Sequence, residues 1–331
     1  MVPLSKTGPA EDPIVHRGWH VVAASADIPA GELVKRNLLG EDLILWRNND
    51  TVIAWQDLCI HRGVRLSLGK IVDGCRLQCA YHGWTYDPSG ACVHIPAHPT
   101  LKPPPKARVR TYACAEVAGL IWVSLGDNSG PLPHLPELDD AAFRQVRSGP
   151  YFVAAGVTRL IENFLDVAHL PFVHEGYLGT PDQAVIDDYN VEPLGEGLFA
   201  PNIGIFQPNP DGSGKGGKVF YDYGVLNPFC VYLRKKQGSN IMTLLYAITP
   251  VHETSSIGWF VTMMNYAHDV PASEIAAFQD TIISQDKPIV ESQRPERVPL
   301  DLAEELHLRS DRLAIAYRQY LRKLGLSFGT E

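Results

Sequence analysis

Two short segments each place one cysteine close to one histidine, an arrangement that suits iron–sulfur chemistry. Cys59-Ile-His61 is followed, after seventeen residues, by Cys79-Ala-Tyr-His82. A Rieske-type [2Fe–2S] cluster needs two thiolates on one iron and two neutral imidazoles on the other. Two loops that each contribute one Cys and one His meet this requirement. These four residues are therefore predicted to bind such a cluster.

A zinc site is the main alternative for the same four residues, because Zn²⁺ accepts the same ligand types. Zinc ligands usually come as a pair of cysteines and a pair of histidines, whereas each segment here mixes the two. Gly63 and Gly83, close to the histidines, permit tight turns that bring main-chain amides near sulfur. The pattern therefore favours the cluster over zinc.

A second group of candidate ligands lies in the segment 162–174. If this segment is helical, Asp166 and His169 lie on one face, and Pro171 ends the helix so that His174 can return to the same point. Two imidazoles and a carboxylate on one face bind Fe(II) in non-haem oxygenases and leave positions open for O₂ and water. The spacing alone is a moderate signal, because any helix with two histidines can produce it.

Together the two patterns resemble the Rieske non-haem iron oxygenases. The resemblance implies that His169 and His174 bind the mononuclear iron. It also implies that Asp166 does not bind iron but forms an electron bridge to a cluster histidine, His82, of a neighbouring subunit. Asn163 is a weaker candidate for a supporting role beside the iron.

The third iron ligand must come from elsewhere in the chain. Asp286 is the candidate, because the segment 282–288 resembles the family's ligand helix, in which an acid precedes a basic residue and often a proline. Asp280 and Glu291 are weaker alternatives, and a solvated helix residue is the non-functional interpretation of Asp286. An apolar stripe would hold Asp286 at the buried edge of this helix, and it consists of Ile275, Phe278, Ile282 and Val290.

Other cysteines and histidines are interpreted as structural. Rieske proteins of the cytochrome bc type carry an extra cysteine in each cluster loop, but Val64 and Tyr81 stand there, which excludes that class. One departure from the oxygenases is Ala80, where a proline usually stands; it affects loop rigidity rather than ligation. Four cysteines without a partner at ligand spacing are expected in the core, and two isolated histidines at the surface: Cys75, Cys92, Cys114, Cys230, His94 and His98.

The length of 331 residues exceeds that of a typical single domain, so two domains are expected. We expect a flexible tail over 1–14, an all-β Rieske domain over 15–130 and a catalytic domain over 131–331. Turns at 48–50 and 87–90 separate short β-branched and aromatic runs in the first domain. Strand-like runs there are 19–23, 43–46, 52–55, 91–95 and 120–125.

Composition changes after the prolines at 131, 133 and 136, and the remainder predicts an α+β fold. The family resemblance implies an antiparallel sheet with a long helix over it, the helix-grip arrangement. Gly325 is expected to end the last helix, with Ser310 or Asp311 at its start. Helix-like segments are 158–170, 272–293 and 310–324, and strand-like runs are 219–233, 241–249 and 257–266.

Charge and hydropathy exclude several classes of function. The net charge of −8 provides no broad basic surface, so nucleic acid is not an expected partner. No apolar run is long enough to span a membrane, and we expect a soluble cytoplasmic protein without disulfides. The segment 212–218 nearly matches a phosphate-binding loop, but Val219 stands where Ser or Thr would bind Mg²⁺. A flexible loop, and by hypothesis a lid over the substrate, is the better interpretation.

A Rieske cluster beside an open Fe(II) site implies reductive activation of O₂ and oxidation of a small organic substrate. The chain has no convincing dinucleotide or flavin site, so a separate NAD(P)H-dependent reductase, with or without a ferredoxin, is implied. The resemblance also implies a homotrimer, or a multiple of one, in which the cluster of one subunit serves the iron of the next.

The segments 18–23, 95–99, 310–312 and 316–318 narrow the resemblance to small monooxygenases that hydroxylate saxitoxin-type alkaloids. More distantly, they resemble oxygenases that N-demethylate methylxanthines or O-demethylate methoxyaromatic acids. Hydroxylation at a C–H bond is therefore the leading interpretation, with N- or O-demethylation and cis-dihydroxylation as alternatives. A Rieske electron carrier and a ligand-binding module are the alternatives without catalysis.

Overall fold

The computed structural model describes residues 12–127, 129–210 and 212–331. The contacts within the chain divide it into two compact units, residues 1–131 and 132–331. The tail expected over residues 1–14 lies outside the described residues up to position 11. Its last residues begin helix α1 (Pro13–Arg17), which Asp12 caps by accepting a hydrogen bond from the amide of Ile14 (2.8 Å).

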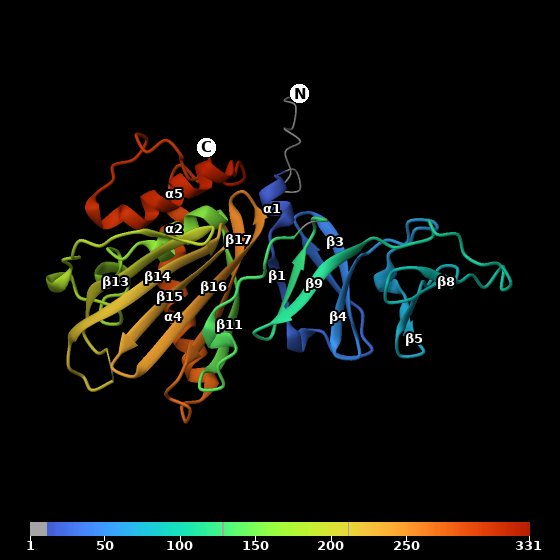
Figure 1. Ribbon diagram of the computed structural model, residues 1–331, viewed down its shortest axis with the longest axis horizontal. Coiled ribbons are helices and arrows are strands. Elements are labelled where there is room, and N and C mark those ends of the chain that lie inside the picture. The colour runs from blue at the N-terminus through green and yellow to red at the C-terminus, as the bar shows by residue number, and fades with distance from the viewer. Residues whose placement is uncertain (1–11, 128, 211) are drawn as a thin grey trace. The chain divides into compact units, whose positions relative to one another are not determined.

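The first unit consists of two antiparallel sheets (Figure 1). One has six strands in the order β1-β10-β9-β4-β3-β2, and the other has four in the order β5-β6-β7-β8. The turn predicted at 48–50 joins β3 to β4, and the turn predicted at 87–90 joins β7 to β8, so both predictions are confirmed. The strands are β1 (His20–Ala24), β2 (Val34–Leu38), β3 (Glu41–Asn48), β4 (Thr51–Gln56), β5 (Lys70–Val72), β6 (Arg76–Gln78), β7 (Thr85–Tyr86), β8 (Cys92–His94), β9 (Thr111–Val117) and β10 (Leu120–Ser124).

One hydrophobic core joins these two sheets. The rings of Trp46 and Trp55 meet edge to face with centroids 5.4 Å apart, and Tyr86 lies 6.4 Å from Trp55 in a similar geometry. Cys59 and Cys79 are buried members of the same core. The two cysteines predicted to bind the cluster are therefore packed against a rigid core of aromatic side chains.

The second unit is built on one antiparallel sheet of seven strands in the order β11-β17-β16-β15-β14-β13-β12 (Figure 1). The sequence predicts one strand over 219–233, but the structure divides this run between two strands, β14 and β15. Asn227 accepts a hydrogen bond from the amide of Phe229 (2.9 Å) and turns the chain between them. The strands are β11 (Arg144–Val153), β12 (Glu192–Leu194), β13 (Gly197–Gln207), β14 (Gly217–Asn227), β15 (Cys230–Gln237), β16 (Asn240–His252) and β17 (Ser255–Met264).

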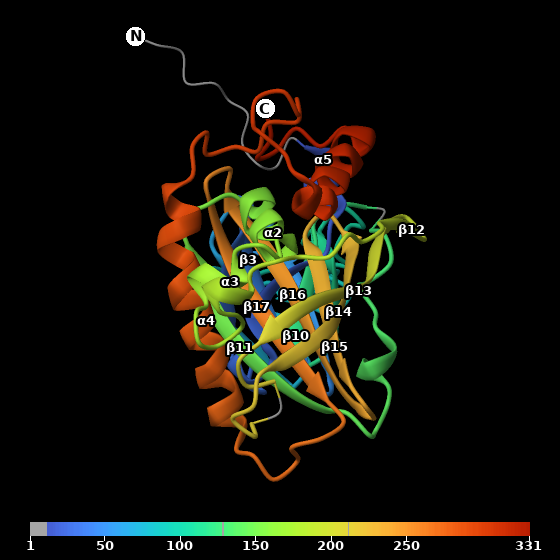
Figure 2. The same ribbon diagram turned by 90° about the vertical axis from the view of Figure 1, so that its left-hand side faces the viewer.

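Four α-helices lie in the described residues of the second unit, and Figure 2 shows the longest, α4, running beside the edge strand β11. Helix α2 packs on β16 and also contacts α4 and α5. Gly325 ends α5 with a positive φ of 76°, as its sequence predicts. The helices are α2 (Val157–Leu165), α3 (Leu170–Val173), α4 (Ala272–Ser292) and α5 (Arg312–Leu324). No helix in the described part of the chain is long and apolar enough to cross a membrane.

Candidate metal centres and substrate cavity

The two Cys–His loops of the first unit repeat one backbone design. The amide of Cys59 donates to the carbonyl five residues later (2.8 Å), and the amide of Gly63 returns to the carbonyl of Cys59 (2.9 Å). The same two bonds recur from Cys79 (2.9 Å) and Gly83 (3.1 Å). Both glycines have a positive φ, 67° and 68°, which explains their requirement at these turns. Main-chain bonds thus hold both loops in matching shapes.

The side chains of the loops separate by type. The sulfurs are buried, whereas His82 is exposed and His61 is partly exposed. The two imidazole rings lie 4.5 Å apart, and the ring of His61 also stacks on Trp84 with centroids 4.4 Å apart. This donor set fits a two-iron cluster with an inner iron on sulfur and an outer iron on imidazole.

The surroundings of the thiols also fit ligands. Burial raises the pKa of the Cys79 thiol overall, and hydrogen bonds from the backbone amides of Tyr81 and His82, which stabilise its thiolate, oppose this rise. The hydroxyl of Tyr86 lies 3.0 Å from the sulfur of Cys59. Hydrogen bonds to the sulfurs are among the factors that set the reduction potential of iron–sulfur centres. The two backbone amides and the Tyr86 hydroxyl lie where they could tune that potential. All six cysteines of the chain have free thiols.

The second unit brings His169, His174 and Asp286 together, with one ligand atom of each within 4.8 Å of the others. The two Nε2 atoms are 3.3 Å apart. The Oδ1 atom of Asp286 lies 3.1 Å from Nε2 of His174 and 3.6 Å from that of His169. Two imidazoles and one carboxylate thus converge from two separate helical segments, which is the donor set of a non-haem iron site.

Groups behind these side chains fix their orientation. The oxygen of Gln285 lies 2.8 Å from Nδ1 of His174, which directs Nε2 toward Asp286. Nδ1 of His169 is a buried nitrogen without a hydrogen bond in the described residues, and it lies 3.5 Å from a carboxylate oxygen of Asp166. Burial lowers the pKa of His174, but the hydrogen bond and charge of Asp286 and the oxygen of Gln285 outweigh it, so the pKa is raised overall. The arrangement favours positive charge at the point of convergence and fits a bound Fe(II).

The helix predicted to carry both Asp166 and His169 ends earlier than expected. Asp166 caps the end of α2 with an extended backbone, and its Oδ1 accepts a hydrogen bond from the amide of Ala168 (2.7 Å). This local turn of a short acidic side chain competes with the helix. Pro171 does not end a helix but lies in the first turn of α3, where a missing amide hydrogen has no cost. The two histidines converge through this break in the chain.

The other predicted site residues have identified positions. The side-chain nitrogen Nδ2 of Asn163 lies 3.4 Å from Oδ1 of Asp286. The alternatives to Asp286 are engaged elsewhere: Asp280 accepts from the hydroxyl of Tyr151 (2.5 Å), and Glu291 from the amide of Ala154 (2.8 Å). His94 and His98 are exposed, and of the four remaining cysteines two are buried and two are only partly so. The expectation that all four cysteines lie in the core is therefore wrong for Cys75 and Cys114.

A cavity of about 660 Å³, including its open mouth, is lined by all three converging side chains. Most of its other walls are apolar, and the polar exceptions include Asn163, Gln279 and Tyr221. A predominantly apolar cavity with few polar groups is typical of sites for small organic molecules. Its apolar wall includes Leu170, Leu178, Leu233, Leu244, Phe260 and Ile283.

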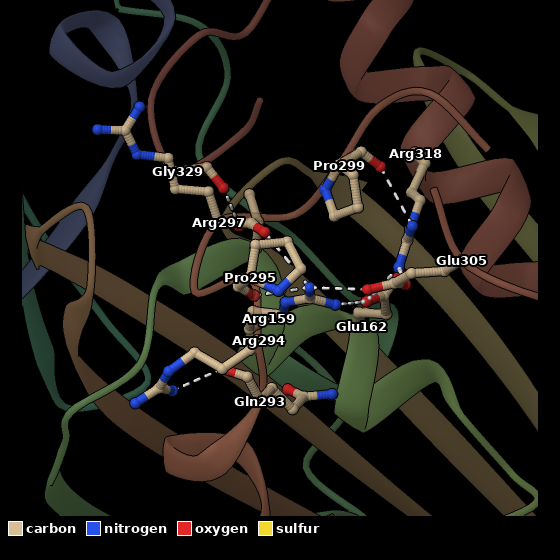
Figure 3. A network of polar contacts seen from close by, with 11 residues as sticks. Arg159, Glu162, Gln293, Arg294, Pro295, Arg297, Pro299, Glu305, Arg318 and Gly329 are labelled. Carbon is tan, nitrogen blue, oxygen red and sulfur yellow. Dashed lines mark hydrogen bonds and ion pairs between the residues drawn. The ribbon is translucent and has the colours of Figure 1, made fainter. Parts of the chain in front are cut away.

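A network of charged residues, shown in Figure 3, anchors helix α2 behind this site. Arg318 on α5 donates to both oxygens of Glu162 (2.5 and 2.9 Å), and Arg159 donates to Glu162 (3.0 Å) and to Glu305 (2.9 Å). Arg318 also pairs with Glu305. Sequence reasoning missed this network; the Arg159–Glu162 spacing of three residues was its only local signal. The same residues line a second, wider cleft that reaches Asp166 and His169.

The fold and these two donor sets define a Rieske-type oxygenase, and the comparisons with known proteins agree. Residues 18–112 match the model of the Rieske [2Fe–2S] domain, and residues 153–327 match that of the vanillate O-demethylase oxygenase C-terminal domain. The chain belongs to the family of Rieske non-haem iron oxygenases. It is therefore an oxidoreductase whose cofactors are a [2Fe–2S] cluster and a mononuclear iron and whose co-substrate is O₂.

Methylxanthine N1-demethylase NdmA of Pseudomonas putida is 33% identical over 92% of this chain and 88% of its own. The structure of Pseudomonas putida CBB5 NdmA with caffeine has a TM-score of 0.81 and 30% identity, covering 96% of this chain and 92% of that one. Oxidoreductase NdmD of Pseudomonas putida is 41% identical over a shorter stretch, 37% of this chain and 21% of that protein.

Proposed function

We propose that this oxygenase oxidises a methyl C–H bond of a small planar substrate and thereby demethylates it. The methyl group favoured is one bound to nitrogen. The observation that carries the proposal is the predominantly apolar cavity whose lining includes His169, His174 and Asp286. The similarity to an N-demethylase over most of both chains supports the N-methyl assignment. The C-terminal family model supports an O-methyl group as the second candidate.

The reaction balances with one O₂ and two electrons. One oxygen atom converts N–CH₃ to N–CH₂OH, and the other leaves as water with two protons. The N–CH₂OH group then breaks its C–N bond, so that nitrogen keeps a proton and formaldehyde departs. When bound, the mononuclear iron supplies the oxidising chemistry with O₂, and the cluster supplies electrons one at a time.

We assign the ligands as the sequence predicts. Cys59, His61, Cys79 and His82 would hold the cluster in the domain 15–130. His169, His174 and Asp286 would hold the mononuclear iron in the domain 131–331. The side chain of Gln285 orients His174 from 2.8 Å, and the side chain of Asn163 orients Asp286 from 3.4 Å. The surrounding apolar wall excludes water and positions the methyl group.

We propose Asp166 as the bridge that carries electrons from the cluster of a neighbouring subunit, through His82 of that subunit, in a homotrimer. Its support is the wide cleft that reaches Asp166 and His169. Exposed apolar side chains occur both at this cleft and near the cluster loops, including Leu306 (89% exposed) and Tyr81 (62%). In the proposed homotrimer, a neighbouring subunit would cover these side chains. An NAD(P)H-dependent reductase, directly or through a ferredoxin, would supply the electrons, and the six cysteines, none of them in a disulfide, favour a cytoplasmic location.

The test is product analysis with a panel of N-methylated heteroaromatic compounds, a reductase, NADH and ¹⁸O₂. Demethylation predicts one formaldehyde per O₂ and per NADH consumed, with equal loss of the N-methyl group. A product that retains its methyl carbon and carries one ¹⁸O would instead identify hydroxylation, and two ¹⁸O atoms would identify dihydroxylation. Either result would overturn the demethylase assignment while leaving the family membership intact.

A further inference from the structure

Three adjacent strands of the sheet carry a series of hydrogen bonds that ends at Tyr221, a residue of the cavity wall. Tyr221 on β14 lies opposite Lys235 on β15, and Gln207 ends the neighbouring strand β13. The Nζ atom of Lys235 donates to Oε1 of Gln207 (2.7 Å), and Nε2 of Gln207 donates to the hydroxyl oxygen of Tyr221 (2.7 Å). Gln207 and Tyr221 are each only 3% exposed.

The chemistry of lysine fixes which group donates and which accepts in each of these hydrogen bonds. A lysine ammonium has three donors and no acceptor, so it must face the oxygen of the Gln207 amide. The NH₂ end of the same amide is then committed to the oxygen of Tyr221. The carbonyl of Pro210 accepts a further hydrogen bond from Lys235 (2.8 Å), which holds the ammonium in place.

The consequence falls on the hydroxyl hydrogen of Tyr221. Because the phenol oxygen already accepts from Gln207, its hydrogen must be donated in another direction. The described residues offer no hydrogen-bond acceptor to it, and the Tyr221 side chain lines both the cavity that contains the predicted iron ligands and the adjoining pocket beside Asn209 and Pro210. Burial raises the pKa of Tyr221, which keeps the hydroxyl protonated. A buried donor without an acceptor is costly unless a ligand supplies one.

We propose that Tyr221 is a specificity-determining donor that binds a carbonyl oxygen of the substrate, with Lys235 and Gln207 as the positioning residues that aim it. The substrate class is then an N-methyl lactam fused to an apolar ring. This inference deepens the proposed function, because it names a substrate class for the same cavity. A substrate bound by this contact and by the apolar wall presents its methyl group in one orientation.

The first experiment measures binding without turnover. Two bicyclic N-methyl probes, 1-methylquinolin-2-one and 1-methylindole, differ in that only the first has a carbonyl oxygen. Calorimetric titration of the anaerobic holoenzyme should give tighter binding of the quinolinone. Tyr221→Phe, which removes only the hydroxyl, should weaken binding of the quinolinone by about tenfold and leave binding of the indole unchanged. Tyr317→Phe is the matched control, since its buried hydroxyl donates to the carbonyl of Pro228 (2.9 Å) and does not line the cavity.

The second experiment tests the direction of these hydrogen bonds. Lys235→Met frees the Gln207 amide to turn its oxygen toward Tyr221, which would then donate to Gln207 instead of the ligand. The preference for the quinolinone should fall with Tyr221 still present. In the Tyr221→Phe background, the same lysine substitution should change the preference no further, because the donor it aims is already gone.

The outcomes separate this inference from the proposed function. Binding that prefers the quinolinone and depends on Tyr221, without any formaldehyde, would count against demethylation and support the donor assignment. Wild-type protein that binds the quinolinone no better than the indole would overturn the assignment. A preference that survives Tyr221→Phe, or additive losses in the double variant, would overturn it as well.

Discussion

The four residues of the cluster loops lie within 24 residues of sequence, from Cys59 to His82, whereas the three side chains that converge in the second unit come from two distant segments, 169–174 and α4. In the loops, main-chain hydrogen bonds and two glycines of positive φ set the shape. In the second unit, His174 is oriented by the side chain of Gln285, and helix α2 is held by a buried network of charges. The first site is therefore a local property of the chain, and the second depends on tertiary packing.

This difference predicts how each site fails. A local loop can lose one ligand and keep its backbone, because its hydrogen bonds do not involve the ligand side chains. The converging site should be sensitive to residues that never touch a ligand atom, because they hold the segments in place.

The largest effect is expected for Cys79→Ser. Loss of one thiolate should abolish the cluster and all turnover, while the mononuclear iron remains, because the two donor sets lie in different units. Visible absorption and sulfide analysis measure the first effect, and iron analysis the second. Cys75→Ser, a partly exposed thiol outside the loops, is the control. Loss of the mononuclear iron along with the cluster would contradict the independence of the sites.

A smaller effect is expected for Asp166→Asn. The substitution keeps the turn at the end of α2 but removes the charge beside His169, which lies 3.5 Å away. Reoxidation of the reduced cluster in single turnover should slow by about 10- to 100-fold with both metals bound. Asp187→Asn, at an exposed carboxylate paired with Lys218, should leave the rate unchanged. An unchanged rate in the Asp166 variant would remove its role as electron bridge.

The smallest effect concerns stability at low pH. Burial tends to raise the pKa of Glu305, but its hydrogen bonds and ion pairs with Arg159 and Arg318 lower it overall. A carboxyl group with a lowered folded-state pKa contributes stability above its ordinary pKa, and this contribution is lost as the pH falls below about 4.5 through the folded value.

Glu305→Gln should therefore lower the free energy of unfolding by about 1–3 kcal/mol at pH 7 and flatten its decline with acid. Urea denaturation at pH 7 and at lower pH measures both changes. Glu296→Gln, at an exposed pair with Arg294, is the control and should change little. Parallel acid profiles for the Glu305 variant and the wild type would contradict the network's contribution.

The sequence predicted those features whose causes are local. Cys59 and His82 stand in motifs that carry their own turn residues, and the runs between turns became strands. Asp286 followed from a family resemblance, because nothing in its local sequence fixes its distance to His174. The expected helix through Asp166 was wrong because its side chain accepts from the amide of Ala168 instead. Tyr221 could not be foreseen as a donor, since its partners lie on two other strands.

The presence of two separate metal sites is tested most directly by the iron and sulfide content of anaerobically purified protein, compared between the wild type, a His169→Ala/His174→Ala variant and Asp280→Ala. We predict about three irons and two sulfides per chain in the wild type and in the Asp280 control. The double variant should hold about two irons, with both sulfides and the visible spectrum of the cluster retained. Equal iron content in the wild type and the double variant, despite added Fe(II), would contradict the mononuclear site and with it the proposed chemistry.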